Sequence, residues 1–222
     1  MNAHAFRLAG AELLALPSGG LFWPQEGLLC VSDLHLGKSE RVARRRGLML
    51  PPYETRATLA RLEADIAATR AGRIVCLGDS FDDLAAGAAL DEGDAQWLTR
   101  LMAGRDWTWI EGNHDPGPLS LGGTHLAEAR VGPLTFRHTA STGAQGEVSG
   151  HYHPKCSLAG QSRPAFLCDA RRLILPAYGA YTGGLRCTDA VLQALFDDPA
   201  IAILTGPRAL PVPLPRATRR SA

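Results

Sequence analysis

Short apolar runs recur along the whole chain, and many of them end at a glycine, a serine or a charged residue. Runs of four or five apolar residues with these boundaries are typical of β-strands. The strand candidates, in chain order, are Ala5–Leu8, Glu12–Leu16, Leu28–Ser32, Arg73–Leu77, Trp107–Ile110, Leu134–His138, Glu147–Ser149, Ala165–Cys168, Leu173–Leu175 and Ala200–Leu204.

Two longer segments have the period of an amphipathic helix. In Tyr53–Thr69 and in Asp91–Met102, leucine, isoleucine, alanine or tryptophan recur at three- and four-residue spacing. The first half of the chain therefore alternates strand and helix, as βαβ units do, while the second half is rich in strands. This pattern predicts an α/β protein in which a two-sheet β-sandwich is flanked by helices.

Length and charge bound the class of protein. A chain of 222 residues can bury a full core, and we expect one domain over residues 1–206. Residues 207–222 carry repeated prolines and arginines, so we expect a flexible tail there. A net charge of +1 excludes a strongly basic nucleic-acid coat, so phosphate affinity must come from a local patch or from bound metal.

The five cysteines are odd in number and form no Cys-x-x-Cys pair. We expect them to be buried thiols in a reducing compartment. The amino-terminal residues contain neither a signal sequence nor an apolar stretch long enough to span a bilayer. We therefore expect a cytoplasmic protein with no membrane partner.

Metal-ligand residue types gather directly after several of the apolar runs. Strands of α/β proteins deliver functional side chains at their carboxyl ends, and divalent transition metals bind imidazole and carboxylate. A single such cluster is more often a helix cap or a turn, but four in one chain predict a metal centre. They are Ser32-Asp33-Leu34-His35, Gly78-Asp79, Gly112-Asn113-His114-Asp115 and Gly150-His151-Tyr152-His153.

The order of these motifs resembles the calcineurin-like metallophosphoesterase superfamily over nearly the whole chain. Asp-x-His, Gly-Asp, Gly-Asn-His-Asp, a later isolated histidine and Gly-His-x-His follow one another as they do in that superfamily. Three longer stretches, residues 33–38, 150–155 and 175–184, resemble the bacterial ligase-associated DNA damage response phosphoesterases. The resemblance implies a four-layer αββα fold and a hydrolase of phosphodiester bonds that uses two divalent metal ions.

The resemblance also implies a ligand for each metal position. Asp79 bridges the two ions, which lie ~3.5–4 Å apart in two-metal phosphoesterases. Asp33 and His35 are two apart, so an extended strand would point both side chains from one face. Mixed nitrogen and oxygen ligands favour manganese, with iron or zinc as alternatives. The first ion is expected at Asp33, His35, Asp79 and His153, and the second at Asp79, Asn113, His138 and His151.

The isolated late histidine has a competitor. Many members of the superfamily have glycine after this histidine, whereas Thr139 follows His138 here. The alternative is His125, which follows Gly122-Gly123-Thr124 and is expected in a surface loop.

His114 stays outside the ligand set and is the candidate catalytic acid. We expect Asp115 to accept a hydrogen bond from its ring and to favour the charged form, so that His114 either protonates the leaving oxygen or stabilises the transition state. Asp82, three residues after Asp79, either orients a ligand or caps a helix.

The sequence says least about the substrate. Lys38, Arg41 and Arg45 share one helical face and would suit a nucleic-acid backbone, although a solvated basic face explains them equally well. Tyr152, Tyr178 and Tyr181 are candidates for base stacking, or ordinary core residues. The resemblance favours DNA as substrate, with a DNA ligase, a helicase and an exonuclease of one repair system as partners. A small-molecule nucleotide phosphodiesterase or pyrophosphatase, and a non-catalytic scaffold, are the alternatives.

Overall fold

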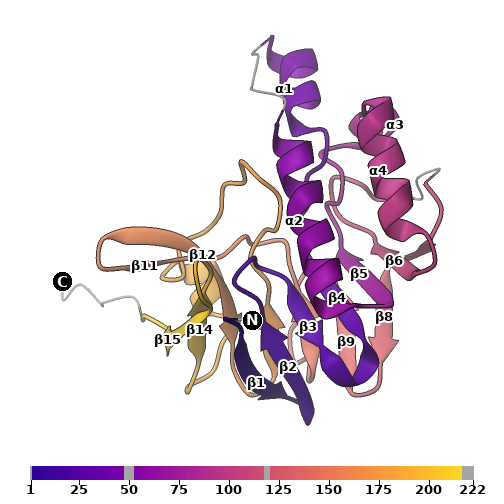
Figure 1. Cartoon of the computed structure of the whole chain (residues 1–222). Coiled ribbons are helices and arrows are strands. Elements are labelled where there is room, and N and C mark those ends of the chain that lie inside the picture. Colours follow the sequence, from indigo (N-terminus) through magenta and orange to yellow (C-terminus); the bar gives the residue numbers. More distant parts are fainter. Residues whose placement is uncertain (1, 48–52, 118–120, 217–222) are drawn as a thin grey trace.

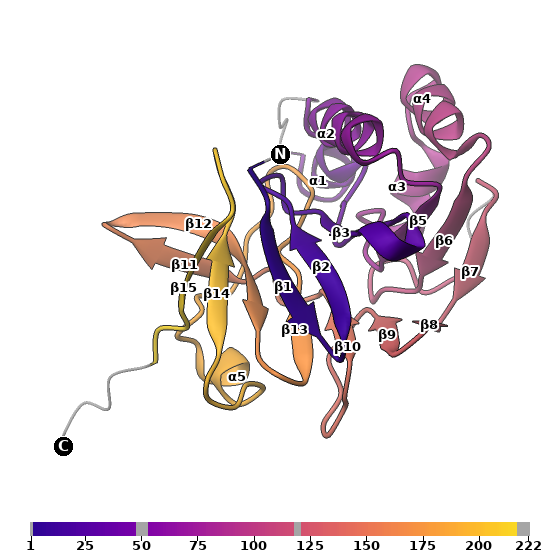
Figure 2. The ribbon, with the colours of Figure 1, turned by 60° about the horizontal axis from the view of Figure 1, so that its bottom comes forward.

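The computed structural model describes residues 2–47, 53–117 and 121–216. Within them the chain forms two mixed β-sheets that pack face to face, with helices outside (Figures 1 and 2). This confirms the expected α/β sandwich. In the same part of the chain, no helix combines the length and the apolar character needed to cross a membrane.

The first sheet has the order β1-β2-β3-β4-β5-β6-β7. Its first four strands pair antiparallel, and β4 to β7 pair parallel. The parallel half therefore ends along one edge, from which the loops after β4, β5 and β6 emerge. The strands are β1 (His4–Leu8), β2 (Ala11–Ala15), β3 (Leu21–Trp23), β4 (Leu28–Val31), β5 (Arg73–Leu77), β6 (Asp106–Ile110) and β7 (Thr124–Leu126).

The second sheet has the order β15-β14-β12-β13-β10-β9-β8, and β11 pairs with β12 beside this path. β10 pairs parallel with both β9 and β13. The strands are β8 (Glu128–Val131), β9 (Leu134–Arg137), β10 (Glu147–Ser149), β11 (Lys155–Leu158), β12 (Gln161–Cys168), β13 (Arg172–Ile174), β14 (Ile201–Leu204) and β15 (Leu210–Pro213).

Helices cover the outer face of the first sheet. The expected helices are present as α2 (Glu54–Thr69) and α4 (Glu92–Met102), and α1 (Lys38–Arg46) and α3 (Leu84–Ala88) add to this layer. On the other side, the outer face of the second sheet packs against α5 (Ala190–Gln193). A short 3-10 helix, Pro24–Glu26, joins β3 to β4.

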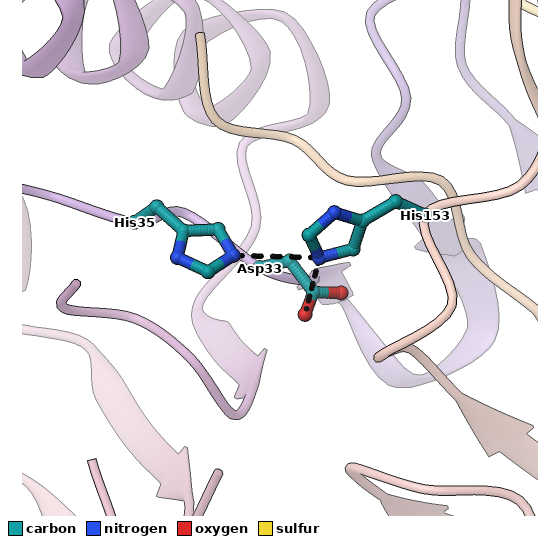
Figure 3. Close-up of side chains that lie close together, drawn as sticks. All are labelled: Asp33, His35 and His153. Atoms are coloured by element: carbon teal, nitrogen blue, oxygen red, sulfur yellow. Dashed lines mark hydrogen bonds and ion pairs between the residues drawn. The ribbon is translucent and has the colours of Figure 1, made fainter. Parts of the chain in front are cut away.

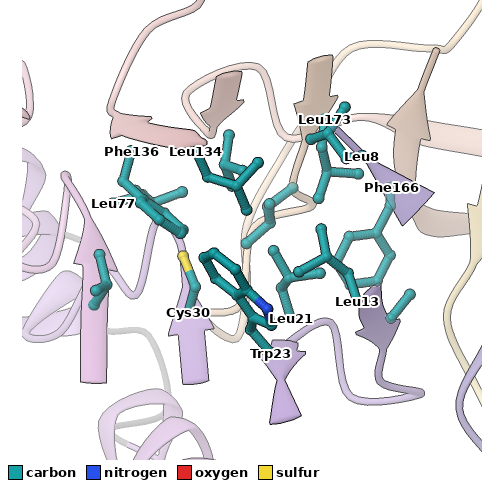
Figure 4. Close-up of a cluster of buried hydrophobic side chains, with 14 of the residues drawn as sticks. Leu8, Leu13, Leu21, Trp23, Cys30, Leu77, Leu134, Phe136, Phe166 and Leu173 are labelled. Carbon is teal, nitrogen blue, oxygen red and sulfur yellow. The ribbon is translucent and has the colours of Figure 1, made fainter. Parts of the chain in front are cut away.

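Three apolar clusters hold the layers together. The central one fills the space between the two sheets and includes Leu13, Trp23, Leu77, Phe136 and Phe166 (Figure 4). The other two lie between the first sheet and α2 and α4, and over the outer face of the second sheet. Burial of these side chains fixes the sheets, and so fixes where the loops at the strand ends meet.

Two sequence expectations need correction. Cys156 and Cys187 form a disulfide, because the isolated bridge between Lys155 and Arg186 brings their Cα atoms to 5.3 Å. Cys30, Cys76 and Cys168 are buried thiols, as expected. The expected tail from residue 207 contains β15, which pairs with β14, while residues 217–222 lie outside the described residues.

Candidate metal centre

The loop after β4 carries the first two candidate ligands in left-handed backbone. Asp33 has φ 54° and His35 has φ 46°, so the extended geometry expected for them is wrong. The loop runs beside the loop after β5: the N–H groups of Asp33 and His35 donate to the carbonyl oxygens of Gly78 and Asp79. This pairing holds the two loops side by side.

Three candidate ligands converge at this point from the two sheets (Figure 3). Nε2 of His153 lies 3.1 Å from Oδ1 of Asp33 and 3.3 Å from Nε2 of His35. Asp33 is fully buried, and among the described residues its Oδ1 accepts no hydrogen bond, although Nε2 of His153 faces it. Buried carboxylate oxygens without a donor are costly unless a cation compensates them.

The ring of His35 is oriented by a carboxylate. Its Nδ1 donates to Oδ1 of Asp82 at 2.9 Å, and Arg41 donates to the other oxygen of Asp82. Burial raises the pKa of Asp82, but the hydrogen bonds and charges of His35 and Arg41 outweigh it and lower that pKa overall. An ionised Asp82 keeps the hydrogen on Nδ1, so the neutral ring turns a lone pair at Nε2 toward Asp33 and His153.

A second group of ligand atoms converges around His138. Its Nδ1 lies 2.8 Å from the carbonyl oxygen of Leu77, which can only accept, so Nδ1 carries the hydrogen. Its Nε2 faces Oδ2 of Asp79 at 3.4 Å, Oδ1 of Asn113 at 3.0 Å and Nδ1 of His151 at 3.1 Å. With a lone pair on Nε2 of His138, these four side chains would form the nitrogen and oxygen donor set that surrounds a cation.

The electrostatics of this group favour positive charge. Burial lowers the pKa of His138, but the hydrogen bond to Asp79 and the charges of Asp33 and Asp79 outweigh it and raise that pKa to about 9. Burial raises the pKa of Asp79, but His138 and His114 outweigh it and lower that pKa to about 2. Asp79 is therefore a carboxylate at neutral pH, and the donor set fits a divalent cation.

Glycines in these motifs make room for the ligands. A Cβ on Gly78, which has φ +71°, would lie 2.4 Å from Nδ1 of His138, and a Cβ on Gly150 would lie 1.7 Å from Oγ of Ser32. Only a residue without a side chain lets these strand ends approach so closely. The glycine before each polar residue is therefore part of the centre's geometry.

The sequence led us to expect that Asp115 binds the ring of His114, but its hydrogen-bond partners in the structure are backbone groups. Its carboxylate accepts hydrogen bonds from the backbone N–H groups of Gly112, Asp79, Ser80 and Phe81. Burial and, to a smaller extent, the charge of Asp79 raise the pKa of Asp115 to about 6. The hydrogen bonds from the N–H groups of Phe81 and Ser80 lower this pKa but do not outweigh the rise. Asp115 thus ties the loop after β6 to the backbone that carries Asp79.

The ring of His114 is held by a backbone carbonyl. Its Nδ1 donates to the carbonyl oxygen of Asp82 at 2.8 Å, and its own backbone N–H donates to Oδ1 of Asp79. The ring centroid lies 5.2 Å from that of His35. His114 is therefore beside both groups of ligand atoms, with Nε2 not committed to a hydrogen bond among the described residues.

His125 lies away from this centre. It belongs to β7, not to a surface loop, and its ring stacks on Trp109 with the centroids 6.4 Å apart. The parallel pairing of β6 with β7 places it there. Of the two competing histidines, His138 is the one that meets Asp79, Asn113 and His151.

The candidate substrate residues differ in burial and in the partners that they contact. Lys38 begins α1 and is half-buried, Arg41 is bound to Asp82, and the side chain of Arg45 lies outside the described part of the chain. Tyr178 is fully buried and donates to Asp65, so it cannot stack on a base. Tyr152 lies beside the ring of His151, and Tyr181 is exposed.

Comparison with known proteins gives a likeness in structure and none in sequence families. No family model matches the sequence, and no curated protein does. The chain is similar in structure to the nuclease MPE of Pseudomonas putida. Its crystal structure superposes with a TM-score of 0.78 at 27% sequence identity, covering 95% of this chain and 100% of that chain. The likeness therefore extends over both sheets.

Proposed function

We propose that this protein is a metal-dependent phosphodiesterase that cleaves DNA. The observation that carries the proposal is the convergence of possible ligand atoms in adjoining groups. One group is Asp33, His35 and His153, and another is Asp79, His138 and His151; a third, His35, Asp82 and His114, adjoins the first through His35. The likeness over 95% of the chain to a protein described as a nuclease supports the choice of reaction.

Two divalent ions fit these donors. The first is assigned to Asp33, His35 and His153, and the second to Asn113, His138 and His151, with Asp79 shared between them. Bound there, the pair would activate water and neutralise charge on a phosphoryl group. Manganese suits the mixed nitrogen and oxygen donors, and iron and zinc are the alternatives.

The protein's own residues would orient the ligand rings and protonate the leaving oxygen. Asp82 and the carbonyl oxygen of Leu77 hold the rings of His35 and His138 so that Nε2 points into the centre. His114, whose Nδ1–H is fixed by the carbonyl of Asp82, presents Nε2 to protonate the leaving oxygen when the ring is charged. Asp115 positions the backbone of residues 79–81 and does not touch the ring of His114.

DNA as the substrate is the finer part of the proposal. The name of the structural neighbour and the motifs shared with ligase-associated DNA damage response phosphoesterases support it. The same motifs support a place in a repair system with a DNA ligase, a helicase and an exonuclease. A small-molecule nucleotide phosphodiesterase would use the same ligands and differ in the surroundings of the centre.

The test is hydrolysis by metal-free protein to which Mn²⁺ is returned. We expect turnover of bis(p-nitrophenyl) phosphate and nicking of circular single-stranded or duplex DNA, both stopped by EDTA. Circular DNA has no ends, so nicking reports an endonuclease. Diester turnover without nicking of either DNA would favour the small-molecule enzyme, and no metal-dependent turnover of any diester would refute the proposal.

A further inference from the structure

An open cavity of about 520 Å³ lies beside the metal centre. Its wall includes Ser18, Arg61 on α2, Lys155 on β11, Ala177 and the chain from Gly179 to Thr182. The volume is within the roughly 300–1,000 Å³ of small-ligand sites. No residue assigned to the metal centre lines it.

One segment of chain separates the cavity from the metal centre. The N–H groups of Tyr178 and Gly179 donate to the carbonyl oxygens of Ser32 and Asp33. At the other end of the segment, a Cβ on Gly184 would lie 2.0 Å from the carbonyl oxygen of His153. Residues 178–184 (Figure 1, the light orange loop beside α2) therefore rest on the backbone of two candidate ligands. Within this segment, Gly179 to Thr182 line the cavity.

The cavity is a local cationic patch on a nearly neutral protein. Arg61 and Lys155 are its charged lining residues, and no described acidic side chain lines it. Arg163 lies at the rim, with Nη1 3.3 Å from where a Cβ of Gly206 would stand. A cavity of similar size at α1, α2 and α4 is instead lined by Glu40, Glu54, Asp91 and Asp94, with Arg56. Of these two cavities, only the first suits a phosphate.

The two cations are held in place and keep spare donors. Lys155 donates to the carbonyl oxygen of Thr182, and Arg61 donates to that of Tyr178 at 2.7 Å. Each uses one of its three or five N–H groups in this way. Asp65, one helical turn from Arg61, is turned to Ser18 and Tyr178, whose hydroxyls both donate to its Oδ2.

Tyr181 supplies an aromatic face at the same cavity. The residue is 54% exposed, and its backbone is left-handed with φ 57°. Bases of single-stranded nucleic acids stack on exposed aromatic rings while cations follow the backbone. The cavity combines the cations Arg61 and Lys155 with the aromatic ring of Tyr181. Tyr181 belongs to the segment that touches the backbone of Asp33 and His153.

We infer that this cavity receives a nucleotide of the DNA strand next to the bond that is cut. Arg61 and Lys155 bind a phosphate of the backbone, and Tyr181 stacks on the base. The inference rests on the proposed function and names the subsite that makes the centre prefer a strand of DNA over a small diester.

The test uses the metal-loaded protein and a fluorescein-labelled phosphorothioate (dT)12, which resists cleavage. Lys155→Gln and Arg61→Gln keep an N–H donor for the loop carbonyls and remove the charge. Each should lower the slope of log affinity against log salt by ~0.7, the value for one phosphate contact on a single strand. Arg100→Gln, which removes an exposed arginine from α4, should leave the slope as in wild type.

The stacking contact is tested separately. Tyr181→Ala should weaken binding of the oligonucleotide by about 5- to 150-fold, as loss of one stacked base does, while Tyr181→Phe keeps the ring and should bind within about twofold of wild type. Equal weakening by Phe and Ala would remove stacking from the proposal.

Turnover of bis(p-nitrophenyl) phosphate separates the subsite from the metal centre. If the glutamine and alanine variants lose diester turnover in the same proportion as DNA binding, the residues support the centre and the subsite is refuted. Unchanged DNA binding in all three variants, by a protein that still nicks DNA, refutes the subsite and leaves the proposed function standing. Wild-type protein that hydrolyses no diester refutes the function first.

Discussion

At the scale of single residues, the candidate ligands occupy backbone that most side chains avoid. Five of the nine non-glycine residues with positive φ in the described chain are Asp33, His35, Asp79, His151 and His153. Each such residue costs on the order of 1–3 kcal/mol, and it persists where neighbouring structure imposes it. For Asp33, His35 and Asp79, the loops after β4 and β5 impose it by pairing with each other.

His114 provides the first prediction at this scale. Because its Nε2 is the proton donor in the proposed function, His114→Ala should keep its metals and lower turnover by ~10²–10⁴, least for diesters whose leaving group needs no proton. Metal content and rates for good and poor leaving groups measure this. His125→Ala removes a histidine that stacks on Trp109 and should retain turnover; loss of metal from His114→Ala would instead make His114 a ligand.

Asp82 provides the second prediction at the scale of single residues. The negative charge of Asp82 keeps the hydrogen of His35 on Nδ1, and an amide carries no such charge. Asp82→Asn should therefore weaken Mn²⁺ binding by roughly 10–100-fold. Titration of metal-free protein with Mn²⁺ gives the affinity. Asp91→Asn, at the exposed start of α4, is the matched control, and equal affinities in the two variants would remove the orienting role of Asp82.

At the scale of elements, the strand pattern could be predicted wherever apolar runs were distinct. β5 and β10 match their predicted ranges, and the other expected strands shift by a few residues at their ends. β3 was missed because three buried residues between turns carry no periodicity. β7, β8, β11 and β15 were missed because each leaves much of its surface partly or fully exposed. α1 and α3 are short and gave no apolar period.

The candidate ligands themselves could be proposed from the sequence because each lies in a short motif of metal-binding residue types, and the motifs follow one another in a recognisable order. Their backbone geometry could not, since it depends on hydrogen bonds between loops about 45 residues apart in sequence, such as that from His35 to Asp79. The partners of Asp115 were missed for the same reason: backbone N–H groups leave no trace in residue types. Nor could the burial of Tyr178 be foreseen from a motif.

Glycine at a strand end gives a prediction for these loops. Gly78 and Gly104 have nearly equal φ, +71° and +73°, but a Cβ at Gly78 would meet His138 and a Cβ at Gly104 nothing within 4 Å. Gly104→Ala should cost about 1–2 kcal/mol of unfolding free energy from backbone strain alone and keep diester turnover. Gly78→Ala should cost more and also lower metal content and turnover. Denaturant unfolding and turnover of both variants test this, and similar behaviour of the two would show that His138 does not need the space.

At the scale of the whole molecule, two sheets bring together ligands that lie 120 residues apart in the sequence. Asp33 and His35 come from the first sheet, and His138, His151 and His153 come from the second. Ions bound between them should therefore stabilise the association of the sheets, by about 2.7 kcal/mol for a site at a hundred times its Kd. We expect Mn²⁺ to raise the melting temperature of metal-free protein and EDTA to reverse the rise; an unchanged melting temperature in protein that binds Mn²⁺ would place the ions elsewhere.

The central claim is that Asp79 serves two ions at once. The most direct measurement is turnover of bis(p-nitrophenyl) phosphate by Asp79→Ala at saturating Mn²⁺, with manganese per chain determined on the same sample and Asp91→Ala as control. We predict that Asp79→Ala falls to background and binds less manganese than wild type, while Asp91→Ala matches wild type in both. Turnover of Asp79→Ala within a few fold of wild type would contradict the two-metal account.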